Sequence, residues 1–326
     1  MAALLNDVKG RVMKAAIIHG AGAAPRYGDF ADPEPADGES EVRMLAAGIH
    51  PVVRSLAAGA HYGSEGAYPL VPGVDGVAMD AAGTARYVGW IRVPWGTLAE
   101  RAASRMGLPV PDGADPIVVA GAMNPGLSSW LPLVARTREV PALGTVLIVG
   151  ATGVAGRIAV QNARALGADR VIGLGRDRAR LAEVAALGAT PVALDEGADA
   201  VARSLDGVAP TLILDYVWGA AAETVWDALA VRGLGDDDAD IVHVQIGTSG
   251  RARAALPGAL LRSRNLVVRG AGAGSTPVAE IMAQLPAFMA RIAAGEVTAP
   301  VRAFGLSQVA DAWAYTGPDR AVVVPD

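Results

Sequence analysis

Three glycines near the middle of the chain have the spacing of a nucleotide-binding loop. The segment LIVGATGVAG covers residues 147–156 and carries a glycine at every third position from Gly150. An apolar run of strand length precedes the loop and a helix-like segment follows it. In that arrangement backbone N–H groups and the helix dipole bind a pyrophosphate.

Each glycine in this loop has a predicted task. The first permits a sharp turn, the second a close approach of phosphate, and the third close packing of the helix on the strand. The alternative is a tight turn between strand and helix that binds no ligand. The residues predicted to bind a cofactor here are Gly150, Ala151, Thr152, Gly153, Val154 and Gly156.

The end of the next predicted strand indicates which dinucleotide binds. The segment VIGLGRD, residues 171–177, places Gly175 and then Arg176 at this end. In NAD-binding domains of this type an acidic residue stands there and bonds the ribose 2′-hydroxyl. A carboxylate would repel a 2′-phosphate, whereas a guanidinium attracts it. The pair therefore predicts NADP(H); the alternative is that Arg176 is a solvated loop residue.

The elements around this loop alternate between strand and helix, which predicts a parallel sheet with helical crossovers. We expect a helix capped by Asn124, with Pro125 at its first position. The predicted strands cover residues 145–150, 170–175, 190–195, 212–217 and 241–247, and the predicted helices residues 123–138, 153–168, 178–189 and 221–231. Three further candidates, Asp215, Tyr216 and Trp218, end a strand, where ligands of such sheets bind. His243 is interpreted as a strand residue to which we assign no role, and Trp226 as a packing residue of the core.

The two ends of the chain have a different character. Short β-like runs with frequent Gly and Pro fill the first third, beginning with MKAAII at residues 13–18, and predict a compact, mostly β unit. Residues 1–12 are interpreted as a mobile N-terminal extension. The tail adds a helix-like segment at 278–296 and a last strand at 321–326, which could fold back onto the first unit.

The composition excludes several classes of function. The chain has 326 residues, 52% hydrophobic and 19% charged, so it can bury a large core. A net charge of −5 argues against nucleic acid or an anionic membrane as the main partner. There is no cysteine, which removes disulfides, thiolate nucleophiles and Cys-ligated metals. We expect a cytoplasmic enzyme, because no uninterrupted apolar run reaches the roughly 18–20 residues that span a bilayer.

Segments spread over nearly the whole chain after Met13 resemble one family in their sequence and order. They include LAAGIHP (45–51), VPGVDGV (71–77), GATGVAG (150–156) and VQIGTSG (244–250). On these segments the chain resembles the zinc-free, quinone oxidoreductase-like branch of the medium-chain dehydrogenase/reductase superfamily. VPGVDGV and GATGVAG together are specific for the superfamily, but none of the segments identifies a substrate.

The resemblance implies an α/β fold with two domains. A Rossmann cofactor-binding domain, a doubly wound parallel sheet, would cover residues 124–269. A GroES-like catalytic domain, mostly β, would be built from residues 13–123 and 270–326. The resemblance also places Ile246, Gly247, Gly270 and Gly272 along the nicotinamide and ribose. It further implies a homodimer, formed by pairing edge strands of two Rossmann sheets at residues 265–269, because exposed strand edges favour such pairing.

The resemblance also bears on zinc. Zinc-dependent members carry a cysteine about where His50 stands, a histidine about where Val74 stands, and a cysteine near Pro125 or Gly126. Only His50 could ligate, and a catalytic zinc needs three protein ligands. The lobe that holds a structural zinc in those relatives has no counterpart. We therefore expect no zinc.

Without zinc, reduction by NADPH of an enone or a quinone is the chemistry that the resemblance favours. His50 stands where relatives often carry an asparagine beside the nicotinamide, and the aspartate that usually follows three residues later is Val53. His50 could donate a hydrogen bond or act as an acid, or be a structural histidine; Tyr62 could donate to a carbonyl, or simply pack at the surface. The alternatives for the whole protein are a biosynthetic tailoring reductase, and an NADPH-binding redox sensor or structural protein with little turnover.

Overall fold

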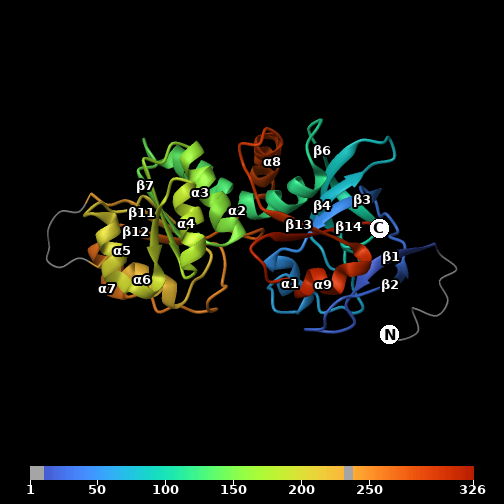
Figure 1. The fold of residues 1–326 in the computed structure, drawn as a ribbon, viewed down its shortest axis with the longest axis horizontal. Helices are drawn as coiled ribbons and strands as arrows, with labels where there is room; N and C mark the ends of the chain where they lie inside the picture. The colour runs from blue at the N-terminus through green and yellow to red at the C-terminus, as the bar shows by residue number, and fades with distance from the viewer. Residues whose placement is uncertain (1–10, 231–237) are drawn as a thin grey trace. The chain divides into compact units, whose positions relative to one another are not determined.

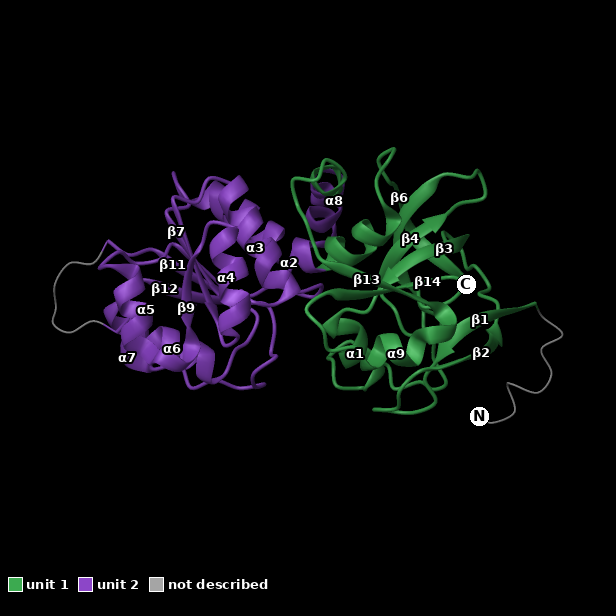
Figure 2. Cartoon of the chain, viewed as in Figure 1, with its two compact units in different colours: residues 1–124, 289–326 green, residues 125–288 purple. Residues whose placement is uncertain are grey.

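The computed structural model describes residues 11–230 and 238–326, and it divides into two compact units (Figures 1 and 2). Unit 1 contains residues 1–124 and 289–326, and unit 2 contains residues 125–288. Of the predicted extension 1–12, only Arg11 and Val12 lie within the described residues, and Val12 begins the first strand.

Unit 2 is built around a parallel sheet whose order is β12-β11-β10-β7-β8-β9. Its strands are β7 (Thr145–Val149), β8 (Arg170–Gly175), β9 (Thr190–Ala193), β10 (Leu212–Asp215), β11 (Ile241–Gln245) and β12 (Leu266–Gly270). All five residues of β7 are buried, as expected of a central strand covered on both faces. The doubly wound parallel sheet that the sequence predicts is therefore confirmed.

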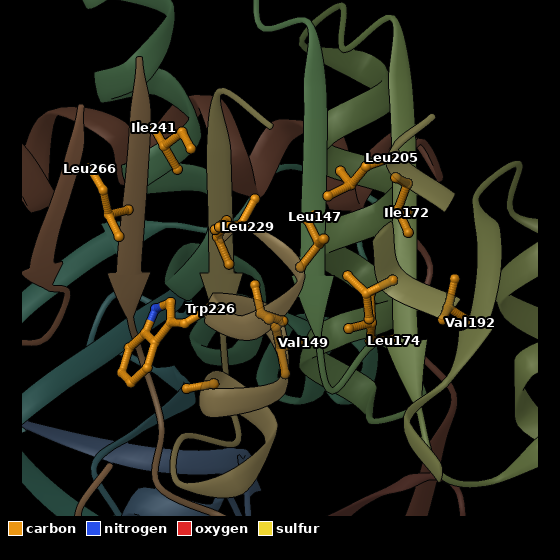
Figure 3. Packing of buried hydrophobic residues seen from close by; sticks show 14 of the residues in the cluster. Leu147, Val149, Ile172, Leu174, Val192, Leu205, Trp226, Leu229, Ile241 and Leu266 are labelled. Carbon is orange, nitrogen blue, oxygen red and sulfur yellow. The ribbon is translucent and has the colours of Figure 1, made fainter. Parts of the chain in front are cut away.

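Helices connect these strands and cover both faces of the sheet (Figure 1). The connecting helices are α3 (Val154–Ala165), α4 (Arg178–Ala186), α5 (Gly197–Leu205), α6 (Ala220–Ala228) and α7 (Gly258–Ser263), with a 3₁₀ turn at Leu194–Glu196. Helix α2 (Pro116–Glu139) precedes β7, and α8 (Val278–Ala293) follows β12. Two buried clusters result. Figure 3 shows one of them, in which Leu147, Ile241 and Leu266 of three strands pack with Trp226 of α6.

Helix α2 begins nine residues before Pro125, its predicted first position, so the predicted cap at Asn124 is wrong. The helix starts at Pro116, where the carboxylate of Asp115 accepts a hydrogen bond from Ile117 N at 2.8 Å. Pro125 lies inside the helix, although an interior proline removes a helical hydrogen bond. Of the apolar residues that precede it in the helix, Val119 to Met123 are buried, and their burial outweighs the local signal for a later start.

Helix α2 is 24 residues long and mostly apolar. Among the described residues it is the helix long and apolar enough to cross a membrane, but 67% of its most apolar window is buried inside the protein. Such burial is characteristic of the core helix of a globular protein.

Unit 1 is mostly β, as predicted. Its larger sheet has the order β13-β14-β3-β4-β5-β6. Strand β3 also pairs with β6, so β3, β4, β5 and β6 form a closed ring. The strands of the unit are β1 (Val12–Ile17), β2 (Arg26–Ala31), β3 (Ser40–Gly48), β4 (Asp75–Met79), β5 (Ala85–Ile91), β6 (Arg101–Pro109), β13 (Val301–Gly305) and β14 (Arg320–Val324). Its short helices are α1 (Pro51–Ala57) and α9 (Val309–Ala314), with a 3₁₀ turn at Leu306–Gln308.

Both ends of the chain contribute to this unit, as the resemblance implied. Strand β14 pairs with β3, with Val322 opposite Gly48. The second boundary differs from the predicted one at 269/270, because the first part of α8 belongs to unit 2. Gln284 and Phe288 explain this difference: the first accepts a hydrogen bond from Trp130 Nε1 of α2 at 3.1 Å, and the second packs against the same indole.

Candidate functional site

The carboxyl ends of β7 and β10 lie side by side at the point where the strand order of unit 2 reverses. From β7 the chain continues to β8 and β9 on one side, and then crosses to β10 on the other side. Loops that leave such neighbouring strands diverge and leave a crevice, which is where doubly wound sheets bind ligands. The glycine loop follows β7, and the segment from Tyr216 follows β10.

Gly150 and Gly156 are required by the fold itself. Gly150 has a φ of +92°, a left-handed conformation that side chains rarely adopt, and a Cβ there would lie 2.9 Å from Val217 Cγ2. A Cβ at Gly156 would lie 2.5 Å from Ala151 Cα and closer still to the Gly150 carbonyl. The sharp turn and the tight contact of α3 with the loop therefore both depend on glycine.

Gly153 is different, because the protein leaves room for a side chain at this position. Its φ is −79°, and the nearest atom to an added Cβ is the Gly150 carbonyl oxygen at 3.6 Å, an ordinary contact. Gly153 is also the N-cap of α3 and provides no side-chain hydrogen bond. The first N–H groups of α3 thus lack a cap and can bind an anion that approaches over Gly153.

At the end of β8, a position without room for a side chain is followed by an exposed cation. A Cβ at Gly175 would lie 3.0 Å from Thr152 Oγ1 and even closer to its methyl group, so an acidic side chain does not fit there. Arg176 is exposed and forms no ion pair within the described residues. Its neighbour Arg178, in contrast, contacts Asp195 at 3.1 Å and Glu196 at 3.0 Å.

The loops after β10, β11 and β12 are connected to one another by main-chain hydrogen bonds. The Asp215 carbonyl accepts from Ile246 N at 2.8 Å and from Gly247 N at 3.1 Å. Ala271 N donates to the Gln245 carbonyl at 2.9 Å. The last loop is closed by Ser275, whose hydroxyl accepts from Gly272 N at 2.8 Å and donates to a nearby carbonyl. The predicted cofactor residues of unit 2 therefore all lie at the carboxyl edge of one sheet.

Tyr216 stands at the reversal of strand order. A Cβ at Gly150 would lie 3.3 Å from Tyr216 Cβ, so its side chain starts next to the glycine loop. Its hydroxyl lies 3.2 Å from that of Ser128 in α2. Burial raises the pKa of Tyr216 to about 12, against the opposing effect of the Ser128 hydrogen bond. The phenol therefore stays protonated at neutral pH and can act as a hydrogen-bond donor.

Unit 1 holds the two predicted catalytic residues in opposite environments. His50 is 1% exposed, and its Nε2 lies 3.4 Å from Asp75 Oδ1. The other oxygen of Asp75 accepts a hydrogen bond from the Tyr87 hydroxyl. Tyr62 is 76% exposed and its ring meets that of His61 at a tilt of 34°, with ring centroids 4.0 Å apart. No hydrogen bond or ring contact joins Tyr62 to His50 within the described residues, and both catalytic roles stay predictions.

The surroundings of His50 determine its charge. Burial lowers the pKa of His50, while Asp75 acts in the opposite direction. The imidazole is therefore uncharged at neutral pH and keeps one N–H to donate. These properties suit a hydrogen-bond donor better than a general acid.

Sequence reasoning missed a buried polar chain in unit 2. His243, which we assigned no role, lies between Trp226 and Asp215 and hydrogen-bonds to both, at 3.0 Å and 3.1 Å. All three side chains are fully buried. No local spacing relates residues on β10, α6 and β11, so the sequence contains no signal that could have revealed this chain.

Comparison with known proteins identifies the family. A probable NADPH-dependent quinone reductase of Emericella nidulans is 30% identical to this chain over 348 aligned positions, which cover 92% of this chain and 96% of that protein. The chain belongs to the quinone oxidoreductase-like branch of the medium-chain dehydrogenase/reductase superfamily. No protein-family model matches it.

Solved structures of this superfamily share the fold along nearly the whole chain. The quinone oxidoreductase of Thermus thermophilus, solved alone and with NADPH, is 26% identical with a TM-score of 0.78, and covers 96% of this chain and 100% of its own. An alcohol dehydrogenase superfamily protein of Novosphingobium aromaticivorans, 22% identical over 96% of this chain and 100% of its own, has a TM-score of 0.79. The latter likeness concerns the fold alone.

Proposed function

We propose that this member of the quinone oxidoreductase-like branch uses NADPH to reduce quinones or α,β-unsaturated carbonyls, without zinc. The coarser assignment, an NADP-dependent oxidoreductase, follows from its family membership. The observation that carries the choice of cofactor is the exposed Arg176 beside Gly175, which has no ion-pair partner in the part of the chain that the structure describes. The relative from Emericella nidulans, named as a quinone reductase, supports the class of substrate.

The residues at the carboxyl edge of unit 2 fit a dinucleotide phosphate. The space over Gly153 and the uncapped start of α3 would bind a pyrophosphate, and Arg176 would bind a 2′-phosphate. The loops at Ile246–Gly247 and Gly270–Gly272 would contact the nicotinamide half. When bound, NADPH supplies a hydride, which an enone or quinone carbon accepts more readily when hydrogen bonds polarise its oxygen.

Zinc independence is part of the proposal. The chain has no cysteine, and no group of three His, Asp or Glu side chains is arranged for a metal in the part that the structure describes. Polarisation of the substrate oxygen then has to come from hydrogen-bond donors. The N–H of His50 and the hydroxyl of Tyr62 are the predicted ones.

The proposal is tested by NADPH oxidation with a panel of quinones and enones, before and after exhaustive treatment with a zinc chelator. We expect turnover with at least one substrate class and the same rate after chelation. His50→Leu and Tyr62→Phe, which each remove the donor, should each lower kcat if the side chain polarises the substrate. NADPH binding without any turnover would favour the sensor or structural alternative, and loss of activity on chelation would contradict zinc independence.

A homodimer through the edge of the parallel sheet is proposed as well. Strand β12 pairs with β11 on one side, and Val267 is 50% exposed on this edge strand. An exposed apolar edge favours pairing with a second copy. We expect a dimer in light scattering and a monomer after Val267→Lys, with Val208→Lys, at a similarly exposed valine elsewhere, as the control. A monomeric wild type at micromolar concentration would contradict the proposal.

A further inference from the structure

A buried carboxylate in unit 2 is connected to an indole through one histidine. Trp226 Nε1 donates to His243 Nδ1 at 3.0 Å, and His243 Nε2 lies 3.1 Å from Asp215 Oδ2. The exposed fraction of each of the three side chains is 0%. Because a buried charge or polar group without partners is strongly unfavourable, every donor and acceptor in this chain has to match.

The indole determines where His243 carries its proton. An indole N–H is a donor only, so His243 Nδ1 has to accept, and the ring proton is on Nε2. That proton points to Asp215 Oδ2. The chain therefore has one direction of donation, from Trp226 through His243 to Asp215, and reversing either end places two donors face to face.

Asp215 uses its remaining acceptors to hold the loops of the candidate site. Its Oδ1 accepts from Val217 N at 2.8 Å and from Trp218 N at 2.9 Å. Trp218 has a φ of +61°, an unfavourable conformation for a bulky residue that these bonds offset. Through its main-chain carbonyl Asp215 also holds Ile246 N and Gly247 N.

Aromatic contacts reinforce the same turn. The Trp218 ring meets Trp226 edge-on, with centroids 5.3 Å apart and planes at 89°, and meets His243 at 5.8 Å and 85°. The turn that follows β10 is thus fixed both by hydrogen bonds from its main chain to Asp215 and by packing of the Trp218 ring. The side chain of Val217, in the same turn, lies against Gly150 of the glycine loop.

We propose that Trp226, His243 and Asp215 form a one-directional hydrogen-bond chain that holds the Tyr216–Trp218 turn and the Ile246–Gly247 loop in the shape that binds NADPH. The three are positioning residues and touch no reacting atom. The inference rests on the proposed NADPH-dependent function, which it deepens by naming what keeps the cofactor site in place.

The decisive test is a double-mutant cycle between Asp215→Asn and Trp226→Phe. The asparagine oxygen has to serve Val217 N and Trp218 N, so its NH₂ group faces His243 Nε2–H, donor against donor. The ring can relieve this only by moving its proton to Nδ1, where it meets the indole N–H. Trp226→Phe removes that N–H. The damage from Asp215→Asn should therefore shrink in the Trp226→Phe background.

Two measurements follow in the full-length protein: the NADPH Kd by fluorescence titration and the midpoint of urea unfolding. We expect Asp215→Asn to raise the Kd by about tenfold in the wild-type background, and several-fold less in the Trp226→Phe background. Trp130→Phe is the matched control, because that indole bonds Gln284 instead of His243. It should not rescue Asp215→Asn. If Asp215→Asn alone fails to fold, recovery of a folded, NADPH-binding double variant supports the proposal in the same way.

Other results overturn it, and each points to a different failure. Equal effects of Asp215→Asn in both backgrounds, or rescue by Trp130→Phe, would show that the hydrogen-bond chain has no fixed direction. Coupling between Asp215→Asn and Trp226→Phe that is seen in the unfolding midpoint but not in the NADPH Kd would give a different answer. It would show that the hydrogen-bond chain supports the fold without positioning the cofactor. A wild type that does not bind NADPH refutes the proposed function, and with it the positioning role, while the unfolding cycle still tests the chain.

Discussion

Arg176→Ala is expected to raise the Kd for NADPH by about 10- to 100-fold and to leave the Kd for NADH unchanged. The guanidinium is exposed at the end of β8 and has no carboxylate partner within the described residues. A 2′-phosphate would gain charge-assisted hydrogen bonds there, whereas NADH has no group to use them. Fluorescence titration with both cofactors measures the ratio directly.

Arg178→Ala is the matched control for this experiment. Arg178 is two residues away and also exposed, but it is already paired with Asp195 and Glu196. Its removal should change the NADPH Kd by less than about threefold, as surface ion pairs contribute little. If Arg176→Ala leaves the ratio of the two Kd values unchanged, or if Arg178→Ala has the larger effect, the assignment of the phosphate-binding cation is wrong.

Two alanine substitutions in the glycine loop should act on different properties, one on NADPH binding and the other on the free energy of unfolding. Gly153→Ala places its methyl group in ordinary contact with the Gly150 carbonyl, so it should leave the free energy of unfolding nearly unchanged. It should weaken NADPH binding by about tenfold or more, because the methyl group occupies the path of the phosphate. Gly156→Ala drives a methyl group into the loop backbone and should lower the free energy of unfolding by about 1–3 kcal/mol.

Urea unfolding and NADPH titration of the same two proteins separate these effects. The comparison controls itself, because both variants carry the same substitution three residues apart. Unimpaired NADPH binding by Gly153→Ala would mean that no phosphate approaches this glycine, and the loop would then be a plain turn between strand and helix. A stable Gly156→Ala protein would contradict the close packing of α3 on the loop.

Much of the parallel sheet could be predicted because its strands are apolar and each is followed by a helical pattern. β7, for example, is apolar at Val146, Leu147, Ile148 and Val149 and is followed at once by a glycine turn. The start of α2 could not be predicted in the same way. Pro125 is a strong local sign of a helix start, whereas the burial that extends the helix back to Pro116 depends on the rest of the fold.

In the candidate site, too, the features that depend on local backbone conformation could be predicted, and those that depend on contacts between distant residues could not. Glycines can be read from the sequence because each one answers a local backbone requirement, such as the positive φ at Gly150. Asp215 was recognisable as a strand end, but its partner His243 lies 28 residues away on the next strand of the sheet. Hydrogen bonds between such residues follow from strand register, which the sequence does not reveal by itself. The same holds for Asp75, which faces His50.

The packing of Thr152 on Gly175 restricts how cofactor use could change during evolution. An acidic residue that would suit NAD cannot enter at position 175 while the threonine stays, because its Cβ would lie within 3.0 Å of Thr152 Oγ1. A smaller residue at 152 has to come first or at the same time, and by itself it adds no contact to NAD. The two positions are therefore epistatic, because an acidic residue at 175 is accommodated only together with a change at Thr152.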